Sequence, residues 1–546
     1  MSRNNSRRKF LLDATKGLGL LGMSPALAQM VVQSIASQAN ANSMANVVGS
    51  DRIYLYFSLP GGPPRWLFDL PLTPNGTASK YTDSFSHNGL GTFIGASGNS
   101  PVVTYKPWYD STSKYWLPPV WGSKPSGGKF THTLSNAAFI RGVDLEINNH
   151  TLGRYRNQSP IIGGLSVAGV LAQKTGNPFP AVSTGSISNA FKAEKALSPI
   201  ELNLSVSTST NPVANIMSYF SGAPASNTLA VKQAFSEFDR YAERNQFIQR
   251  GLAEAKDRAD ALVTLGVKTF TDRWGATYSK YLNLVQEAFT NANTSLFVDN
   301  KAIPTPTVAS GSNPDPRTRR GDGIFMGNMT DIRAMVNSGT SVANLATTFA
   351  TVEILVTTGL TQVLTADIGA LTGLVYDANG NKMNLTNDQH FIGSLMATLG
   401  TTYYYRAILN CTEELIATLK ADGLFNRTVI QFGSEFNRNA KADGSGSDHG
   451  FLGGSALLIS GMIPKTTVVG NIKHDTATAY AGTWGLAELH PLTNKEFPLR
   501  INDIAKTVCG MLNVRNVANN GVYVLKTNGS TWESYGPTLG EAKNVA

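Results

Sequence analysis

The chain has 546 residues, of which 42% are hydrophobic and 15% charged, and its formal net charge is +9. Five bases and one acid lie in the first 28 residues, so the remainder holds 41 bases against 36 acids and carries +5. This mild balance, without a compact basic patch interleaved with aromatics, argues against a nucleic-acid-binding protein. The length suits one large α/β domain with insertions, or two domains.

The first 28 residues have the pattern of an export signal. Ser6-Arg7-Arg8-Lys9-Phe10 is a twin-arginine motif, and Ala26-Leu27-Ala28 is a small-residue cleavage site. The apolar stretch between them is too short to span a bilayer, and no later apolar run approaches a membrane span. We expect the twin-arginine export machinery to carry the folded protein into the periplasm or out of the cell. Residues 29–50 would then be a linker before a single domain over 51–546.

The first half alternates strands, loops and helices. Residues 70–135 are rich in Gly, Ser, Thr, Pro and Trp, which is typical of long ordered loops. A charged amphipathic stretch over 228–292 predicts one or two long helices, a helical insertion on the domain. The other predicted elements are strands at Ile53–Leu59 and Ala138–Ile147 and a helix at Ile161–Gln173.

The second half is more regular and sets the fold class. Strands that alternate with helices predict a mixed, mostly parallel sheet with helices on both faces, an α/β fold. Helices are predicted at Val342–Leu360, Asn387–Ala421 and Arg500–Leu512, and strands at Gln362–Ile368, Thr428–Phe432, Ser455–Ser460 and Thr467–Ile472. The two cysteines, Cys411 and Cys509, lie in helical patterns and favour small buried apolar roles, with a single bridge as the alternative.

A polar, glycine-rich segment after the Thr428–Phe432 strand carries the main chemical signal. It contains Glu435, Asp448 and His449, and a second cluster, Asp388-Gln389-His390, lies upstream. Carboxylates and imidazoles are ligands for Zn, Mn, Mg or Ca, so the set predicts a site for one or two divalent ions. The alternative is a pair of solvated surface loops.

The spacing of Asp388 and His390 restricts this hypothesis. Side chains two residues apart diverge on a helix but share a side in an extended segment, so both can bind one ion only ahead of the helix proper. Thr386 or Asn387 as N-cap would leave them near the helix entry. We also expect a helix start and the end of the following strand at opposite ends of a regular unit. Asp388 and His390 can then meet Asp448 and His449 only if the 380–390 loop folds back over the edge of the sheet.

Several of these motifs together resemble a known family. The twin-arginine leader, N-D-Q-H before a long helix, R-T-V-I-Q-F-G-S-E-F-N-R, and G-S-G-S-D-H-G are similar to the domain of unknown function 1501 family of exported bacterial proteins. That family shows D-T-H, S-E-F-G-R and D-H-G at corresponding places, and the C-terminal segment with His490 also resembles its ending. The resemblance covers about 380–515 well and 50–170 more weakly. It implies a fold related to the alkaline phosphatase and sulfatase superfamily, whose sites hold metals with Asp and His.

The chain departs from the family pattern at two places. The family has G-G-x-D-G after its first strand, whereas Pro64 stands here where the Asp is expected, with Asp69 as a nearby substitute. The family's serine-histidine segment corresponds to Asn149-His150-Thr151, so the resemblance implies His150 as a ligand and Thr151 as a candidate nucleophile. His490 is a further candidate ligand.

Three functional hypotheses follow from the sequence. The first is an exported metal-dependent hydrolase of small phosphate or sulfate esters. The second is a non-catalytic exported binding or envelope protein that retains the fold. The third is a surface or assembly protein that interacts through its loops at 70–135 and helices at 228–292.

Overall fold

The structure is a computed structural model. It describes residues 50–71, 93–94, 101–103, 108–177, 179–184, 190–194, 197, 199–202, 267–290, 340–368, 372–376, 382–384, 387–441, 444–450, 453–480 and 484–543. The predicted leader and all of the predicted linker except Ser50 therefore lie outside the described residues, as do 228–266 and 291–292 of the predicted helical stretch.

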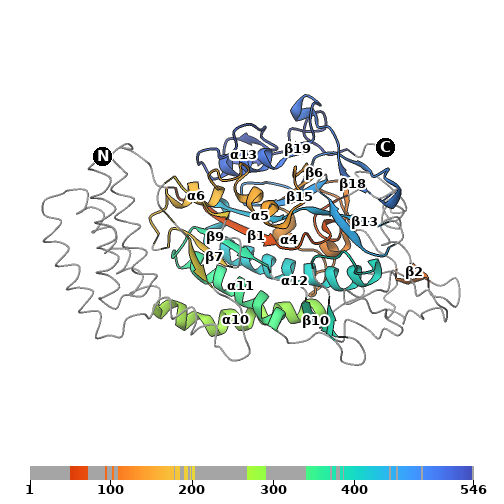
Figure 1. Ribbon diagram of the computed structural model, residues 1–546. Coiled ribbons are helices and arrows are strands. Elements are labelled where there is room, and N and C mark those ends of the chain that lie inside the picture. The colour runs from red at the N-terminus through yellow and green to blue at the C-terminus, as the bar shows by residue number, and fades with distance from the viewer. Residues whose placement is uncertain are drawn as a thin grey trace, which may run out of the picture.

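A nine-stranded mixed sheet forms the centre of the molecule (Figure 1). Its order is β16 (Thr467–Val469), β6 (Ala137–Asp144), β15 (Gly454–Ile459), β12 (Thr428–Ser434), β1 (Ile53–Leu59), β9 (Val363–Asp367), β7 (Val182–Thr184) and β8 (Ile200–Leu202), with β19 (Leu499–Arg500) beside β6. Neighbouring strands run parallel except where β15 pairs with β12 and β6. The predicted α/β class with a mostly parallel mixed sheet is confirmed.

Strands β1 and β12 are the interior pair on which the candidate site is built. Both are buried along their whole length, and Leu59 pairs with Ser434 at their carboxyl ends. In β1, Leu55 and Phe57 join one hydrophobic core while Tyr54 and Tyr56 join the other. Because successive side chains of a strand point to opposite faces, an almost wholly apolar strand must be covered on both sides.

Helices supply that cover on each face (Figure 1). One core includes residues of α10 (Val267–Thr290), α11 (Thr340–Thr357) and α12 (Ser394–Ala421), and the other includes residues of α6 (Val167–Ala172) and α13 (Ile501–Met511), with α5 (His150–Gln158) against α13 and β12. The described part of the predicted insertion, α10, joins this helical layer. Its Lys280 and Tyr281 donate hydrogen bonds of 2.7 and 2.6 Å to the buried Glu353 of α11.

Two predicted helices begin later than expected, and one helix was not predicted. The helix expected at 161–173 is only α6, because Gly163 has a positive φ of 72° and Ser166 caps the helix by accepting from the amide of Gly169. Helix α5 was not predicted, since it is polar and carries Gly153 in its middle. Helix α12 begins at Ser394 with Gly393 as N-cap, so neither Thr386 nor Asn387 caps it.

The remaining elements are short and peripheral. The described part of 70–135 holds β2 (Phe93–Ile94), β3 (Pro101–Val103), β4 (Trp108–Asp110), β5 (Tyr115–Leu117) and α4 (Thr131–Leu134). Further hairpins are β10–β11 (Thr372–Tyr376, Lys382–Asn384), β13–β14 (Asn437–Ala440, Ser447–Gly450), β17–β18 (Ile472–His474, Trp484–Ala487) and β20–β21 (Lys526–Asn528, Thr531–Glu533). The strand expected at 467–472 is divided at Gly470, which has a φ of 99°.

Cys411 and Cys509 are both buried and free, so they form no bridge. None of the described helices is long and apolar enough to cross a membrane.

Candidate metal centre

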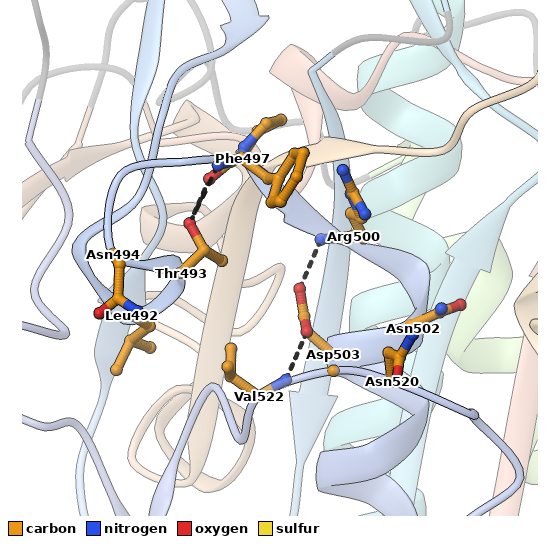
Figure 2. Close-up of a pocket in the computed structure, with 11 residues that line it drawn as sticks. Leu492, Thr493, Asn494, Phe497, Arg500, Asn502, Asp503, Asn520 and Val522 are labelled. Carbon is orange, nitrogen blue, oxygen red and sulfur yellow. Dashed lines mark hydrogen bonds between the residues drawn. The ribbon is translucent and has the colours of Figure 1, made fainter.

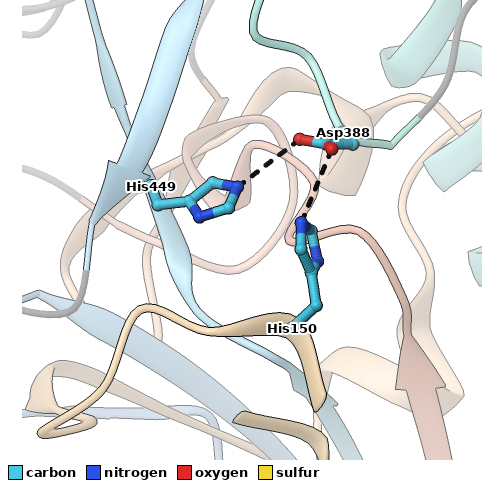
Figure 3. A group of neighbouring side chains, drawn as sticks. All are labelled: His150, Asp388 and His449. Atoms are coloured by element: carbon cyan, nitrogen blue, oxygen red, sulfur yellow. Dashed lines mark ion pairs between the residues drawn. The ribbon is translucent and has the colours of Figure 1, made fainter. Parts of the chain in front are cut away.

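Three side chains from distant parts of the chain converge beyond the carboxyl ends of β1 and β12. The Nε2 atom of His150 lies 3.5 Å from Oδ2 of Asp388, and Nε2 of His449 lies 3.7 Å from Oδ1 of the same carboxylate. One ligand atom from each residue lies within 4.8 Å of the others. Figure 3 shows the two imidazoles and the carboxylate pointing toward one another. This geometry fits the reach of a single bound cation.

The segment that carries Asp388 is fixed at the sheet edge by backbone contacts. Asn387 donates through Nδ2 to the carbonyl of Pro60, 2.8 Å away, in the turn that ends β1. Ser447, the first residue of β14, donates through its amide to the carbonyl of Gln389 at 3.1 Å. Asp388 lies between these anchors and His390 directly after them, and both precede α12, so they avoid the divergence that a helix would impose.

Helix α5 and the end of β12 position His150. Asn157 of α5 donates to the carbonyl of Ser434 at 2.7 Å, and Gly153 lies against the backbone of Glu435, where a Cβ atom would overlap the carbonyl oxygen. This close approach places Nδ1 of His150 against the buried Glu435 carboxylate, which also accepts from Arg154. Because a carboxylate oxygen accepts, Nδ1 donates, and in the neutral imidazole the lone pair is then on Nε2.

The other two histidines have the same arrangement. Nδ1 of His449 lies 2.9 Å from the backbone carbonyl of Asn148, so it must donate. Nδ1 of His390 lies 3.1 Å from Oδ1 of Asp448, and its Nε2 lies 3.3 Å from Oδ1 of Asp388. Each imidazole is thus oriented by an oxygen acceptor behind it, which is how proteins orient metal-binding histidines.

Three Nε2 atoms thus surround the Asp388 carboxylate at 3.3 to 3.7 Å, and in neutral imidazoles they direct their lone pairs at it. Nitrogen and oxygen lone pairs at this distance repel unless a cation lies between them. Among the residues that the structure describes, Nε2 of His449 is buried and has no hydrogen-bond partner. A buried nitrogen without a partner that lies 3.7 Å from a carboxylate oxygen fits a bound cation.

The charges around Asp388 keep it ionised. Burial by itself would raise its pKa, but the Arg438 guanidinium, His390 and His150 outweigh burial and lower the pKa of this carboxyl. Arg438 is buried, pairs with Asp388 and also donates to the carbonyl of Gly61 at 2.8 Å. Burial and the neighbouring Arg438 and imidazoles lower the pKa of His449. The neutral imidazole that a metal requires is therefore favoured.

Two of the predicted ligands, Glu435 and Asp448, lie behind histidines, outside the converging group. Glu435 contacts Nδ1 of His150, whereas Asp448 contacts Nδ1 of His390 and accepts from the Tyr480 hydroxyl at 2.7 Å. Burial would raise the pKa of Asp448, but its hydrogen bonds with Tyr480 and His390 lower it. The hydrogen bond to Asp448 in turn raises the pKa of Tyr480 to about 12. Both carboxylates thus orient and polarise imidazoles.

The remaining predicted residues have different outcomes. Thr151 follows His150 in the first turn of α5 and is exposed. His490 is fully buried, where its Nδ1 accepts from the amide of Leu492 at 3.3 Å, and it is not in the converging group. Asp69 is buried too, pairs with Arg65 and accepts from Ser455 at 2.9 Å, so it does not replace the aspartate missing at Pro64.

Sequence reasoning missed the residues that support the group. Phe436 lies beneath the imidazoles, with ring centroids 4.1 Å from His449 and 4.9 Å from His150. Gly62 permits this, because a Cβ atom there would overlap the Phe436 ring. Arg438 was missed as well, although it belongs to the same F-N-R motif as Phe436.

A separate open cavity of about 450 Å³ lies between the start of α13 and the 492–498 loop. Figure 2 shows that Asp503 of α13 accepts from the amides of Arg500 and Val522 beside the exposed Phe497. Of the residues that the structure describes, the ones that line this cavity include none of the predicted site residues. These bonds cap the start of α13 and tie it to the loop that carries Val522.

No family model matches the chain, and no curated protein matches it significantly. The resemblance to the domain of unknown function 1501 family therefore rests on the motifs quoted above.

Proposed function

We propose that this protein is an exported metal-dependent hydrolase of phosphate or sulfate esters. One observation carries the proposal: imidazole lone pairs fixed by acceptors behind them face the single carboxylate of Asp388. His150, Asp388 and His449 would hold a divalent ion, and His390 adds a fourth nitrogen beside them.

The donor set favours a particular class of ion. Imidazole nitrogens with one carboxylate suit Zn²⁺ and, less well, Mn²⁺, whereas Ca²⁺ and Mg²⁺ prefer all-oxygen sites. When bound, such an ion polarises an ester oxygen and acidifies a water molecule. With His150, Asp388 and His449 as the ligands and His390 beside them, the ion would keep a coordination position for substrate, as catalytic zinc ions do.

Cationic side chains near the group favour an anionic substrate. Arg154 and Lys441 are about a quarter exposed, and each contacts a carboxylate behind a site histidine, Glu435 and Asp448 respectively. These cations are placed to attract the charged head of an ester as it approaches from solvent. Glu435 and Asp448 hold the Nδ1 protons and keep the imidazoles aimed at Asp388.

The location of the group supports the same class of reaction. Open α/β sheets bind ligands beyond the carboxyl ends of their strands, and the group lies beyond β1 and β12 there. The motifs that supply His150, Asp388 and His449 are those that resemble a family related to alkaline phosphatases and sulfatases. We extend the proposal to an alkaline phosphatase-like fold and to twin-arginine export.

A non-catalytic binding protein is the second candidate, and one observation favours it. In the turn after β1, Gly61-Gly62-Pro63-Pro64, Pro64 stands where the family resemblance implies an aspartate that binds metal, and Thr151 is the one candidate nucleophile. A protein that keeps one metal ion but lacks this aspartate would bind an anion without cleaving it.

Metal analysis and an ester assay on the mature protein test the proposal. Chelator-stripped protein should bind about one equivalent of Zn²⁺ in calorimetry and then hydrolyse 4-nitrophenyl phosphate or 4-nitrophenyl sulfate. His449→Ala should weaken zinc binding by at least roughly 100-fold, since a ligand is lost. His132→Ala, which removes an exposed imidazole on α4, is the matched control and should bind normally.

The two outcomes separate the candidates. Zinc binding without hydrolysis of either ester would favour the binding protein over the hydrolase. Zinc binding that His449→Ala does not weaken would contradict the metal centre itself.

A further inference from the structure

An exposed aromatic ring stands at the rim of the metal centre. Phe391 directly follows His390, with ring centroids 6.1 Å apart, and 54% of its surface is exposed. The chain on either side of it is anchored, since Gln389 and Ile392 are each no more than 2% exposed. The ring is therefore presented to solvent by a fixed segment.

A cation lies beside this ring and faces the site. Nζ of Lys441 is 5.9 Å from the centroid of Phe391 and 3.6 Å from Oδ1 of Asp448. Asp448 in turn contacts His390, which faces Asp388. A continuous path of contacts thus runs from the metal ligands through Lys441 to Phe391.

The backbone holds this arrangement in place before any ligand arrives. Gly446 packs against the carbonyl of His390, and the Ser447 hydroxyl donates to the carbonyl of Gln389 at 3.1 Å. A preorganised surface loses little conformational entropy when it binds. An exposed ring at a fixed place next to a charged site is suited to stack on part of a ligand.

The geometry points to esters whose organic group carries an aromatic ring, with the anionic head at the metal centre and the ring stacked on Phe391. Lys441 lies where it adds charge for the head and a cation–π contact for the stacked rings. This inference rests on the proposed function for the position of the anionic head. It adds the class of organic group, which nothing in the metal site itself specifies.

Binding of uncleavable probes tests the inference without turnover. Zinc-loaded protein should bind benzylphosphonate or benzylsulfonate about fivefold to tenfold more tightly than the methyl analogue, as expected for one aromatic pair. Phe391→Ala should remove this preference, and Phe391→Leu should keep only part of it. Tyr109→Ala removes a 41% exposed ring elsewhere, on β4, and should leave the preference unchanged.

A turnover assay separates this inference from the proposed function. Benzyl and butyl phosphate release alcohols of similar basicity, so a difference in kcat/KM between them reports recognition of the organic group. Phe391→Ala should lower kcat/KM for the benzyl ester about fivefold to tenfold and leave the butyl ester within about twofold.

Each result has one meaning. Equal binding of benzyl and methyl probes, no binding of either benzyl probe, or a preference that survives Phe391→Ala overturns the aromatic inference. Hydrolysis of simple esters under those results would leave the proposed function standing. If Phe391→Ala abolishes the preference for benzyl over methyl probes but no ester is hydrolysed, the inference holds for a binding protein and not for a hydrolase.

Discussion

His150 illustrates how one buried carboxylate determines what an imidazole can bind. Glu435 is only 1% exposed and contacts Nδ1 of His150 as well as Arg154. A proton held on Nδ1 leaves the Nε2 lone pair directed at Asp388 and makes it more electron-rich. The carboxylate thus acts on a bound ion through the imidazole, without touching the ion.

Replacing this carboxylate should weaken metal binding while the fold survives. We expect Glu435→Gln to lower zinc affinity by about 10- to 100-fold, because the neutral amide polarises His150 less and also offers an NH group to Nδ1. Calorimetric titration of chelator-stripped protein measures the change. Glu413→Gln, at another buried carboxylate that accepts from the amides of His132 and Thr133, controls for the loss of a buried charge. Equal zinc affinity in both variants would contradict the orienting role.

His490, a predicted ligand that lies outside the converging group, is buried and affects stability. Burial lowers its pKa to about 4, and its Nδ1 accepts from the amide of Leu492 as the N-cap of a short 3-10 helix, Pro491–Thr493. In the unfolded chain an imidazole titrates near pH 6.5. Between about pH 4 and 6.5 the His490 imidazole therefore stays neutral in the folded protein but is protonated in the unfolded chain.

The direction of the pH effect follows from this depressed pKa. The contribution of His490 is fully present above about pH 6.5 and is lost as the pH falls toward 4, by roughly 3 kcal/mol in all. His490→Asn keeps a capping acceptor but does not titrate. The free energy of unfolding should therefore fall less steeply in the variant between pH 6.5 and 4, as followed by denaturant melts. Parallel pH profiles for the two proteins would show that burial does not depress this pKa.

At the scale of elements, the site depends on how the β13–β14 hairpin meets the segment at 387–393. Helix α12 runs back toward the amino edge of the sheet before β12 returns to the carboxyl edge. The start of the helix and the end of the next strand therefore lie at the same edge, and the expectation that they would lie at opposite ends was wrong. In the hairpin, Arg438 pairs with His449, and both side chains reach Asp388, whereas Asp448 pairs with Asn439 and contacts His390.

Gly446 makes this junction possible. A Cβ atom there would overlap the carbonyl oxygen of His390, so Gly446→Ala should push the hairpin away from the segment and weaken zinc binding by at least tenfold. Gly423→Ala is the matched control, since Gly423 also has a positive φ, 68°, but its Cβ would meet nothing within 4 Å. The control should lose about 1 kcal/mol of stability and no zinc affinity. Unchanged zinc binding in Gly446→Ala would show that the junction tolerates the shift.

At the scale of the whole molecule, the leader predicts the compartment in which the site works. Changing Arg7→Lys and Arg8→Lys together should leave unprocessed protein in the cytoplasm, because the twin-arginine machinery reads the arginine pair as an address. Cell fractionation with immunoblotting measures the distribution, and Lys9→Arg, which keeps the pair and the charge, is the control. Normal export and processing of the double variant would contradict the twin-arginine prediction.

Much of the sheet was predictable because its strands carry their own signal. Ile53–Leu59 is a wholly apolar run apart from Ser58, it ends at a Pro-Gly turn, and the structure has the strand at those bounds. The Thr428–Phe432 strand was also found, two residues short of its end. Apolar runs of this kind favour burial on both faces wherever they occur in a chain. Helix α5 lacks any such run and was missed, and it is the helix that carries His150.

Local patterns were enough to predict the α/β class, the strands at Ile53–Leu59 and Thr428–Phe432 and the residue types of the candidate site, because periodicity and composition are local properties. The pairing of those strands, and which of seven candidate ligands meet, emerged only from the three-dimensional structure. It brought His150 and His449 to Asp388, put Glu435 and Asp448 behind imidazoles, and buried His490 elsewhere. The physical reason is that these contacts join residues up to some three hundred positions apart, as in the His449–Asn148 hydrogen bond. No local pattern records such distances; they depend on strand order and on close backbone approaches such as the one at Gly446.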